Sequence, residues 1–278
     1  MIPLDYLILR SARRVVPAPL MRWLLRRKLG AESGLETREP AQAAARYLDV
    51  LASLGRHLHG AVVMILGYGG SFGLAVELLR RGAGHLVLCD PYAVPTRRAN
   101  LRAAAAGSPF LRRDGDRVAP DPSWITVPAG SVEEYARAGG RPVDLVFSSS
   151  VFEHLEDVGA VAAALASITT PNGCQVHFID LRDHYFRRPF EMLCHSPSVW
   201  ERWLDPPSHL NRLRPRDYET HFRRHFARVG WEATAADPEA FRKARPRIGP
   251  EFLTGDEATD AVTRLRLVAW EPRKVRSA

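Results

Sequence analysis

The sequence contains only three cysteines in 278 residues, Cys89, Cys174 and Cys194, and no two of them are close in sequence. An odd number of scattered cysteines argues against a disulfide framework and against a zinc site built from thiolates. No stretch approaches the roughly 18 apolar residues of a membrane-spanning helix, and the apolar run Leu4–Leu9 is too short for a secretory signal. We therefore expect a cytoplasmic protein.

Lysine is nearly absent, because the 39 basic residues include lysine only at positions 28, 243 and 274. Together with the abundance of alanine, this composition favours a GC-rich bacterial gene. The net charge of +8 is concentrated in residues 1–30, which hold seven basic residues and one acid. Since the rest of the chain is nearly neutral, we expect no nucleic-acid substrate.

The basic segment includes Leu20–Leu29, which places Leu20, Trp23 and Leu24 on one face of a predicted helix, with arginines beside it. One interpretation is a lid that packs over the active site and excludes water. The alternative is peripheral contact of residues 1–30 with an anionic membrane or an acidic carrier protein. The sequence leaves both interpretations open, and it does not indicate the oligomeric state.

The most informative stretch is Val62–Gly73, an apolar run followed by a glycine-rich turn. A short continuous apolar run is typical of a central parallel strand that is covered on both faces. A helix and a second apolar run, His85–Cys89, follow, and Asp90 ends that run. Glycines let a backbone approach a ligand closely, and a carboxylate at Asp90 can accept ribose hydroxyls. The pattern predicts a nucleotide-binding βαβ unit.

The spacing of the glycines bears on which nucleotide is bound. A dinucleotide fingerprint has glycine at its first, third and sixth positions, whereas here, with Gly67 counted as the first position, Phe72 occupies the sixth. The bulky ring disfavours close seating of a pyrophosphate. An NAD-dependent oxidoreductase therefore stays an alternative rather than the first interpretation.

The second half of the chain carries a resemblance to a known family. A predicted strand, Val143–Phe147, leads into three serines and then the sequence Phe152-Glu-His-Leu, and a further strand follows at Cys174–Ile179. With the glycine turn and Asp90, this arrangement resembles class I S-adenosylmethionine (SAM)-dependent methyltransferases, in particular a small-molecule subgroup. The resemblance covers about residues 55–185. Many members have an acid where this chain has Ile65.

The resemblance implies that SAM is the cofactor and that S-adenosylhomocysteine is the product. It places the glycine turn beneath the methionine part, Asp90 on the ribose, and the loops after the third and fourth strands beside the adenine and the methyl group. The cofactor-binding residues that it implies are Gly67, Tyr68, Gly69, Gly70, Asp90, Pro91, Tyr92, Ser131, Val132, Glu133, Ser148 and Ser149.

The order of predicted elements indicates an α/β fold: a Rossmann-like, seven-stranded methyltransferase sheet with a helical N-terminal extension and an insertion after strand five. A predicted helix begins at Pro40, and another spans Val158–Ile168. Five alternating β/α steps precede two late strands, at 230–235 and 264–270. We expect the extension over residues 1–58 and the catalytic domain over 59–278. Residues 107–122 are predicted to be a charged loop.

The insertion, at about residues 181–217, leaves the carboxyl end of strand five, where open α/β sheets bind ligands. Long loops in compact domains are usually functional, so we interpret this one as the acceptor-binding region. Its arginines and aromatic residues suit a polar or anionic acceptor with a flat portion. The predicted acceptor-binding residues are Tyr185, Arg188, Asn211, Arg212 and Arg214.

Methyl transfer to a hydroxyl group needs a base that removes its proton. His154 and His184 follow strands four and five, so either is a candidate base, and Asp183 is a candidate for orienting it. A metal site at Asp180, Asp183, His184 and His195 is the alternative, by analogy with catechol-type methyltransferases. Those enzymes supply an acid at the end of strand four, where this chain has serines, so we expect no metal.

The sequence therefore predicts a SAM-dependent methyltransferase that moves a methyl group to a small-molecule or glycan-type acceptor, most simply at oxygen, in a biosynthetic pathway. The transfer would be an in-line displacement in which alignment of the reactants supplies most of the rate. The alternatives are an NAD-dependent oxidoreductase and a SAM-binding protein without catalytic activity. The acceptor's identity cannot be read from the sequence.

Overall fold

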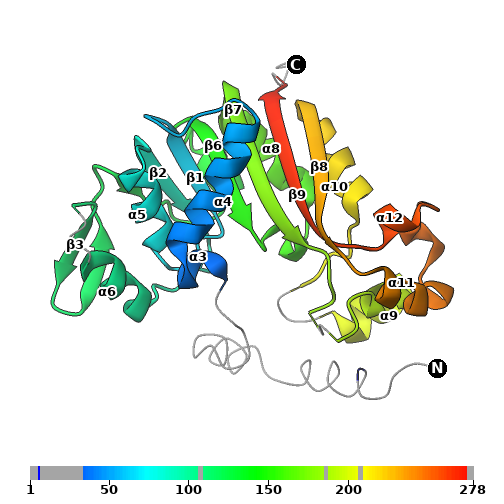
Figure 1. Ribbon diagram of the computed structural model, residues 1–278. Coiled ribbons are helices and arrows are strands. Elements are labelled where there is room, and N and C mark those ends of the chain that lie inside the picture. Colours follow the sequence, from blue (N-terminus) through cyan, green and yellow to red (C-terminus); the bar gives the residue numbers. More distant parts are fainter. Residues whose placement is uncertain (1–5, 7–33, 106–108, 185–186, 206–208, 274–278) are drawn as a thin grey trace.

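The computed structural model describes residues 6, 34–105, 109–184, 187–205 and 209–273 (Figure 1). Its main feature is a seven-stranded sheet with the strand order β5-β2-β1-β6-β7-β9-β8. The strands of this sheet are β1 Val62–Leu66, β2 His85–Cys89, β5 Ile125–Thr126, β6 Val143–Ser149, β7 Thr169–Asp180, β8 Phe226–Ala236 and β9 Val262–Pro272.

The strands from β5 to β7 run parallel, and β9 lies antiparallel between β7 and β8. The chain runs outward from β1 to β2 and β5, and then returns to β6 on the other side of β1. This reversal of strand order next to β1 is the position at which open α/β sheets bind ligands. The predicted fold class, with its late strand pair, is confirmed.

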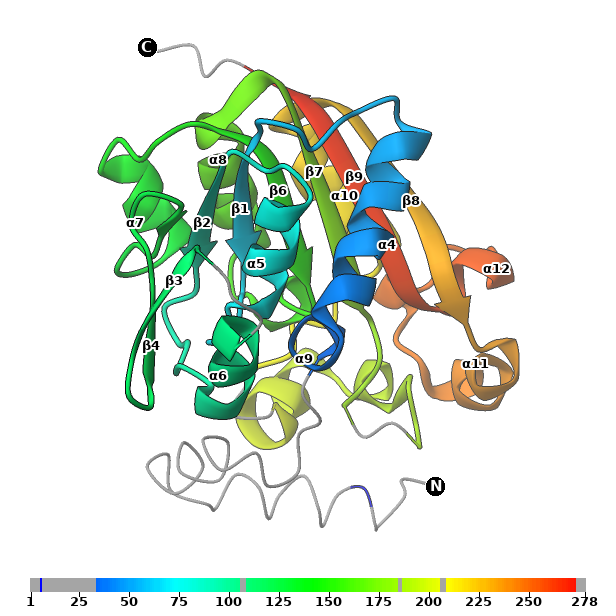
Figure 2. The same ribbon diagram turned by 60° about the vertical axis from the view of Figure 1, so that its left-hand side comes forward.

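Helices cover both faces of the sheet (Figures 1 and 2). Side chains of β1 alternate between two cores, because Val63 and Ile65 join one cluster and Met64 and Leu66 join the other. The longer helices and their bounds are α4 Pro40–Ser53, α5 Gly73–Arg80 and α6 Arg97–Ala105 towards the first face, and α7 Val132–Arg137, α8 Val158–Ile168 and α10 Pro215–Arg223 on the second.

The helix α4, which lies within the predicted extension 1–58, packs against the sheet. Pro40 is its first residue, as the sequence predicts, and Tyr47 and Leu51 are buried in the cluster that covers β1. The short helix α3, Leu35–Arg38, precedes it. The predicted basic helix Leu20–Leu29 lies outside the described residues. Among the residues that are described, no helix combines the length and apolarity needed to cross a membrane.

Two regions differ from what the sequence predicts. The predicted charged loop 107–122 contains an antiparallel hairpin, β3 Leu111–Asp114 with β4 Arg117–Pro120. Its side chains are mostly exposed, so the strands lack the apolar alternation that would reveal them. Residues 237–261, between the late strands, form helical turns that the sequence does not predict.

The insertion after β7 packs with those turns into a third apolar cluster, which includes Phe190, Trp200, Leu210 and Phe241. Tyr6 is fully buried in the same cluster, so one residue of the N-terminal segment contacts the insertion. The short elements of this region are η2 Glu191–Cys194, α9 Pro197–Val199, η3 Trp200–Leu204, α11 Pro238–Ala244, η4 Arg245–Arg247, η5 Pro250–Phe252 and α12 Glu257–Asp260. In Figure 2, the arrowheads of β1, β2 and β6 point towards the edge where α9 lies.

Candidate active site

The glycine turn after β1 is held tightly on two sides. Gly67 and Gly70 have φ angles of +76° and +78°, a region that favours glycine. A Cβ on Gly67 would lie 2.2 Å from Val151 Cγ2, and a Cβ on Gly70 would lie 1.9 Å from the carbonyl oxygen of Val94. Gly69, with φ +60°, faces open space. The turn therefore fits between the loops that follow β2 and β6 and leaves one side open to a ligand.

Asp90 links the ends of β1 and β2. One oxygen of its carboxylate accepts a hydrogen bond from the backbone amide of Gly69 at 3.0 Å, and the other accepts one from Tyr92 at 2.9 Å. The Tyr92 side chain is 90 % exposed, and Pro91 beside it is also exposed. Tyr68 stacks on Phe72, with 6.2 Å between the ring centroids. These predicted cofactor-binding residues thus gather around one edge of the sheet.

Ser131 and its neighbours lie at the amino end of α7, beside β2. The Ser131 hydroxyl accepts from the Glu134 amide, and Glu134 accepts from the Ser131 amide, which is a reciprocal cap. Val132 is buried in the core, and Glu133 is partly exposed. The side chains of Ser131 and Val132 thus support the helix, and Glu133 is left facing solvent beside the Asp90 edge.

The serines at the end of β6 face in different directions. Ser148 is 1 % exposed, and its hydroxyl pairs with Nδ1 of His177 on β7 at 2.8 Å. Ser149 accepts a hydrogen bond from Arg46 on α4 at 3.3 Å. Ser150 has an unusual φ of +52°, which turns the chain towards the next helix. Ser148 therefore commits its side chain to the core.

His177 continues a buried chain of hydrogen bonds. Its Nε2 lies 3.0 Å from Gln175 Oε1, and Gln175 donates its amide to the Thr169 hydroxyl at 2.8 Å. Thr169 in turn donates to the Leu165 carbonyl oxygen at 2.7 Å. Since Gln175 Oε1 only accepts, His177 carries its proton on Nε2 and accepts from Ser148 at Nδ1. Burial lowers the pKa of His177 to about 3.

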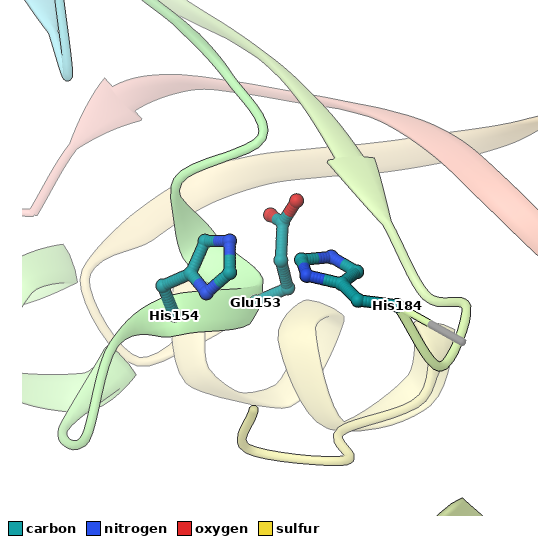
Figure 3. Close-up of side chains that lie close together, drawn as sticks. All are labelled: Glu153, His154 and His184. Carbon is teal, nitrogen blue, oxygen red and sulfur yellow. The ribbon is translucent and has the colours of Figure 1, made fainter. Parts of the chain in front are cut away.

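A second polar cluster lies just beyond β6. The short helix η1, Phe152–His154, presents Glu153 and His154, and His184 follows β7 (Figure 3). One potential ligand atom from each of the three residues lies within 4.8 Å of the others. The imidazole rings of His154 and His184 have centroids 4.9 Å apart. The structure thus brings both predicted bases together.

Glu153 is the member of this cluster that sequence reasoning misses as a functional candidate. It is 3 % exposed, and its carboxylate oxygens have no hydrogen-bond partner of good geometry among the described residues, although the Ser150 hydroxyl and the backbone of Glu153 and Asp180 are near enough to oppose a rise in its pKa. Burial, together with the nearby negative charge of Asp180, raises its pKa to about 8. The sequence does carry a signal for it, because Glu153 directly precedes the candidate base His154 after strand four.

Asn211 holds η1 in place. Its side-chain amide donates to the carbonyl oxygens of Phe152 at 2.7 Å and Leu155 at 3.0 Å, and its backbone amide donates to that of Glu153 at 3.0 Å. Tyr218 donates to the Asn211 side-chain oxygen at 3.0 Å. Asn211 therefore positions the Glu153–His154 pair, and its role as an acceptor ligand stays a prediction.

Two predicted acceptor-binding arginines are buried among backbone carbonyls. Arg212 donates to the His195 carbonyl oxygen at 2.8 Å, and Arg214 donates to that of Val262 at 2.7 Å. Burial lowers the pKa of Arg214 to about 10. Both side chains brace the insertion, whereas Arg188 is partly exposed and Tyr185 lies outside the described residues.

Asp183, the predicted orienting residue, is fully buried and accepts a hydrogen bond from the Tyr6 hydroxyl. The Tyr6 ring also stacks on His195, with 5.7 Å between the centroids. Of the four residues in the alternative metal cluster, Asp180 pairs with the Arg182 guanidinium at 2.6 Å and His195 lies 3.9 Å from Glu191. The cluster that the structure assembles is the different one at Glu153, His154 and His184.

Comparisons with known proteins give matches among solved structures only. No protein-family model matches the sequence, and a search of curated proteins finds no match. The chain is similar to magnesium protoporphyrin IX methyltransferase from Synechocystis with bound S-adenosylhomocysteine, at 16 % identity and a TM-score of 0.49, over 97 % of this chain and 100 % of that chain.

Two further solved structures are similar over most of the chain. One is a SAM-dependent methyltransferase from Mesorhizobium loti, at 17 % identity and a TM-score of 0.44, over 84 % of this chain and 100 % of that one. The other is a phosphoethanolamine N-methyltransferase from Haemonchus contortus in complex with SAM, at 12 % identity and a TM-score of 0.49, over 88 % and 61 %. At these identities the likeness concerns the fold alone.

Proposed function

We propose that this protein is a SAM-dependent methyltransferase that acts on a small-molecule or glycan-type acceptor at oxygen. The observation that carries the proposal is the glycine turn next to the reversal of strand order. Its Gly67 packs on Val151 of the β6 loop, its Gly69 faces open space, and Asp90 lies at the end of the neighbouring strand. A ribose-binding carboxylate beside an open glycine backbone suits an adenosine cofactor.

The residues around this turn would each serve one part of SAM. The backbone of Gly67 to Gly70 would lie beneath the methionine portion, and Asp90 would accept the ribose hydroxyls. Pro91, Tyr92 and Glu133 lie beside the same edge of the sheet, where the adenine would fit. The absence of an acid at Ile65 leaves the methionine amino group to backbone carbonyls, since Ile65 is apolar and buried.

The reaction forms one bond and breaks one. An electron pair of the acceptor oxygen forms the new O–CH₃ bond, the S–CH₃ bond breaks, and its electrons stay on sulfur as the thioether of S-adenosylhomocysteine. The acceptor's proton must leave to a base. His154 is suited to this role, because its Nδ1 lies 2.8 Å from the His209 carbonyl oxygen and must donate there. The lone pair of the ring is then on Nε2.

His184 lies against His154 and offers a second base for the same proton. Asp183 precedes it in sequence and would influence its orientation through the backbone. Asn211 would act through η1, because its hydrogen bonds fix the segment that carries His154. The basic N-terminal segment 1–30 remains a prediction, either as a lid or as a contact with a membrane or carrier protein.

Calorimetric titration of the full chain with SAM, S-adenosylhomocysteine and NAD tests the proposal. We expect SAM or S-adenosylhomocysteine to bind, and Asp90→Ala to weaken binding by about 100-fold, since hydrogen bonds to a charged group are worth about 1.5–3 kcal/mol each. Asp49→Ala is a matched control, because Asp49 is an exposed acid on α4. Failure to bind either ligand, or tighter binding of NAD, would exclude the proposed cofactor.

A further inference from the structure

The cluster of Glu153, His154 and His184 has the composition of a metal site. Figure 3 shows the Glu153 carboxylate between two imidazole rings that come from different segments of the chain. One ligand atom of each residue lies within 4.8 Å of the other two. Metal–nitrogen and metal–oxygen bonds of about 2.0–2.2 Å hold ligand atoms at most about 4.4 Å apart, so small side-chain rotations would bring all three onto one ion.

Glu153 provides an independent observation that points to a ligand. Its carboxylate is 97 % shielded from solvent, and both oxygens lack a hydrogen-bond partner of good geometry within the described parts of the chain. A buried carboxylate without partners is costly, whereas a bound cation satisfies both its charge and its lone pairs. Natural structures rarely leave such a group unsatisfied, so this carboxylate is suited to bind a ligand.

His154 is oriented as a ligand to an ion. Its Nδ1 lies 2.8 Å from the His209 carbonyl oxygen, which can only accept, so the proton is on Nδ1 and the lone pair is on Nε2. Histidines that bind metals almost always donate their other ring nitrogen to a carboxylate or carbonyl in this way. His209 itself is fixed by Asp205, whose carboxylate lies 2.6 Å from its Nδ1.

The donor set selects among cations. Two imidazole nitrogens and one carboxylate suit zinc and the neighbouring transition ions, whereas magnesium and calcium prefer oxygen donors. Three protein ligands leave at least one coordination position open, as in catalytic rather than structural zinc sites. Arg182, two residues before His184, donates its hydrogen bonds to Asp180.

We propose that Glu153, His154 and His184 bind one divalent cation of the zinc type. This proposal revises the expectation of no metal. That expectation rested on the serines at the end of strand four, whereas the acid in the cluster is Glu153, a few residues further along. Under the proposed methyltransferase function, a bound ion would replace the histidines as the means of activating the acceptor. His154 and His184 would then act as ligands and not as bases, and the ion would lower the pKa of the acceptor hydroxyl so that its proton leaves to solvent. That last step rests on the proposed function, whereas the cation site does not.

Equilibrium dialysis of the full chain against buffered Zn²⁺, after removal of metal by a chelator, tests the site. We expect one Zn²⁺ per chain, not displaced by excess Mg²⁺. Glu153→Gln and His184→Gln are each expected to weaken binding by on the order of 100-fold. His57→Gln is the matched control, since His57 is exposed and lies far from the cluster in sequence.

Thermal unfolding of each variant shows whether it has folded, and His184→Gln gives the answer if Glu153→Gln does not fold, because His184 is only partly buried. The proposal would be overturned if the natural chain did not bind Zn²⁺. It would also be overturned if the two ligand variants bound Zn²⁺ as tightly as the control does. Titration of the zinc-free protein with SAM separates the two proposals. If the protein binds SAM but not Zn²⁺, the proposed cation site alone is rejected. If it binds Zn²⁺ but not SAM, the proposed SAM-dependent function is rejected and the cation site stands.

Discussion

Two buried polar groups lie side by side near the ends of β6 and β7, and they are satisfied very differently. The chain from Ser148 through His177 to Gln175 and Thr169 links each of its side chains to a partner within the protein. The neighbouring group is Glu153. It follows Phe152, whose ring centroid lies 4.6 Å from that of His177. The Glu153 carboxylate has no hydrogen-bond partner of good geometry among the described residues.

The difference separates a structural group from a functional one. A closed hydrogen-bond chain in a core rigidifies the fold and needs nothing from outside. An open carboxylate at the same depth lowers stability unless a proton or a cation joins it. We infer that β6 and β7 use the first group to hold their register and keep the second for a ligand. Substitutions in the two groups should therefore change the free energy of unfolding in opposite directions.

The largest effect is expected from His177→Leu. This change leaves the Ser148 hydroxyl and the Gln175 carbonyl oxygen buried without partners, at about 1–3 kcal/mol each. We expect the free energy of unfolding, measured in urea, to fall by about 2–5 kcal/mol. His57→Leu, at an exposed position, should change it by less than about 0.5 kcal/mol.

Adding Ser148→Ala to His177→Leu should cost less than the sum of the two single changes, because one orphaned hydroxyl is then removed. Full additivity would mean that the two side chains do not share a hydrogen bond. The chain that starts at Ser148 could then not be called a closed structural network.

A smaller effect of opposite sign is expected from Glu153→Met in metal-free protein. Methionine fills a similar volume and removes the unsatisfied carboxylate, so the free energy of unfolding should rise by about 1–3 kcal/mol. Glu156→Met, three residues along on the exposed side of the same segment, is the control and should be nearly neutral. A loss of stability in Glu153→Met would show that the carboxylate is satisfied after all.

The smallest effect concerns pH. The pKa of His177 is lowered to about 3 in the folded protein by burial, whereas an unfolded histidine titrates near pH 6.5. Between these values the unfolded chain binds a proton that the folded protein does not. This contribution to stability is therefore fully present above about pH 6.5 and is lost as the pH falls towards 3, by up to about 1.4 kcal/mol per pH unit.

His177→Gln cannot titrate, so its difference in unfolding free energy from the natural sequence should shrink from pH 7 to pH 5. Urea unfolding at the two pH values measures this. Parallel stability curves would indicate that the histidine is accessible to protons in the folded state.

The sequence was sufficient wherever local patterns decide the structure. The predicted strand His85–Cys89 and the predicted helix Val158–Ile168 have the observed bounds. The helix begins there because the Asp157 side chain accepts from the Ala160 amide, which is a local cap. The glycine turn was equally readable, since its positive φ angles need glycine.

The candidate site was only partly readable, because its key property arises from distant contacts. The burial of Glu153 depends on η1 being fixed by Asn211, which lies 59 residues from Phe152 in sequence. Likewise, the local sequence around Arg214 does not show that this arginine is buried against backbone carbonyl oxygens rather than exposed to bind a substrate. The hairpin β3–β4 was missed for the opposite reason, because exposed strands carry no apolar alternation.

The position of β9 has a consequence for how the protein is made. This strand is synthesised after β8, yet it lies between β7 and β8 in the finished sheet. On the ribosome, β7 and β8 are therefore both complete while their facing edges have no partner, and such edges invite pairing with other chains. The nascent chain must keep that gap open until residues 262–272 emerge, so chaperone dependence should concentrate between the synthesis of β8 and that of β9.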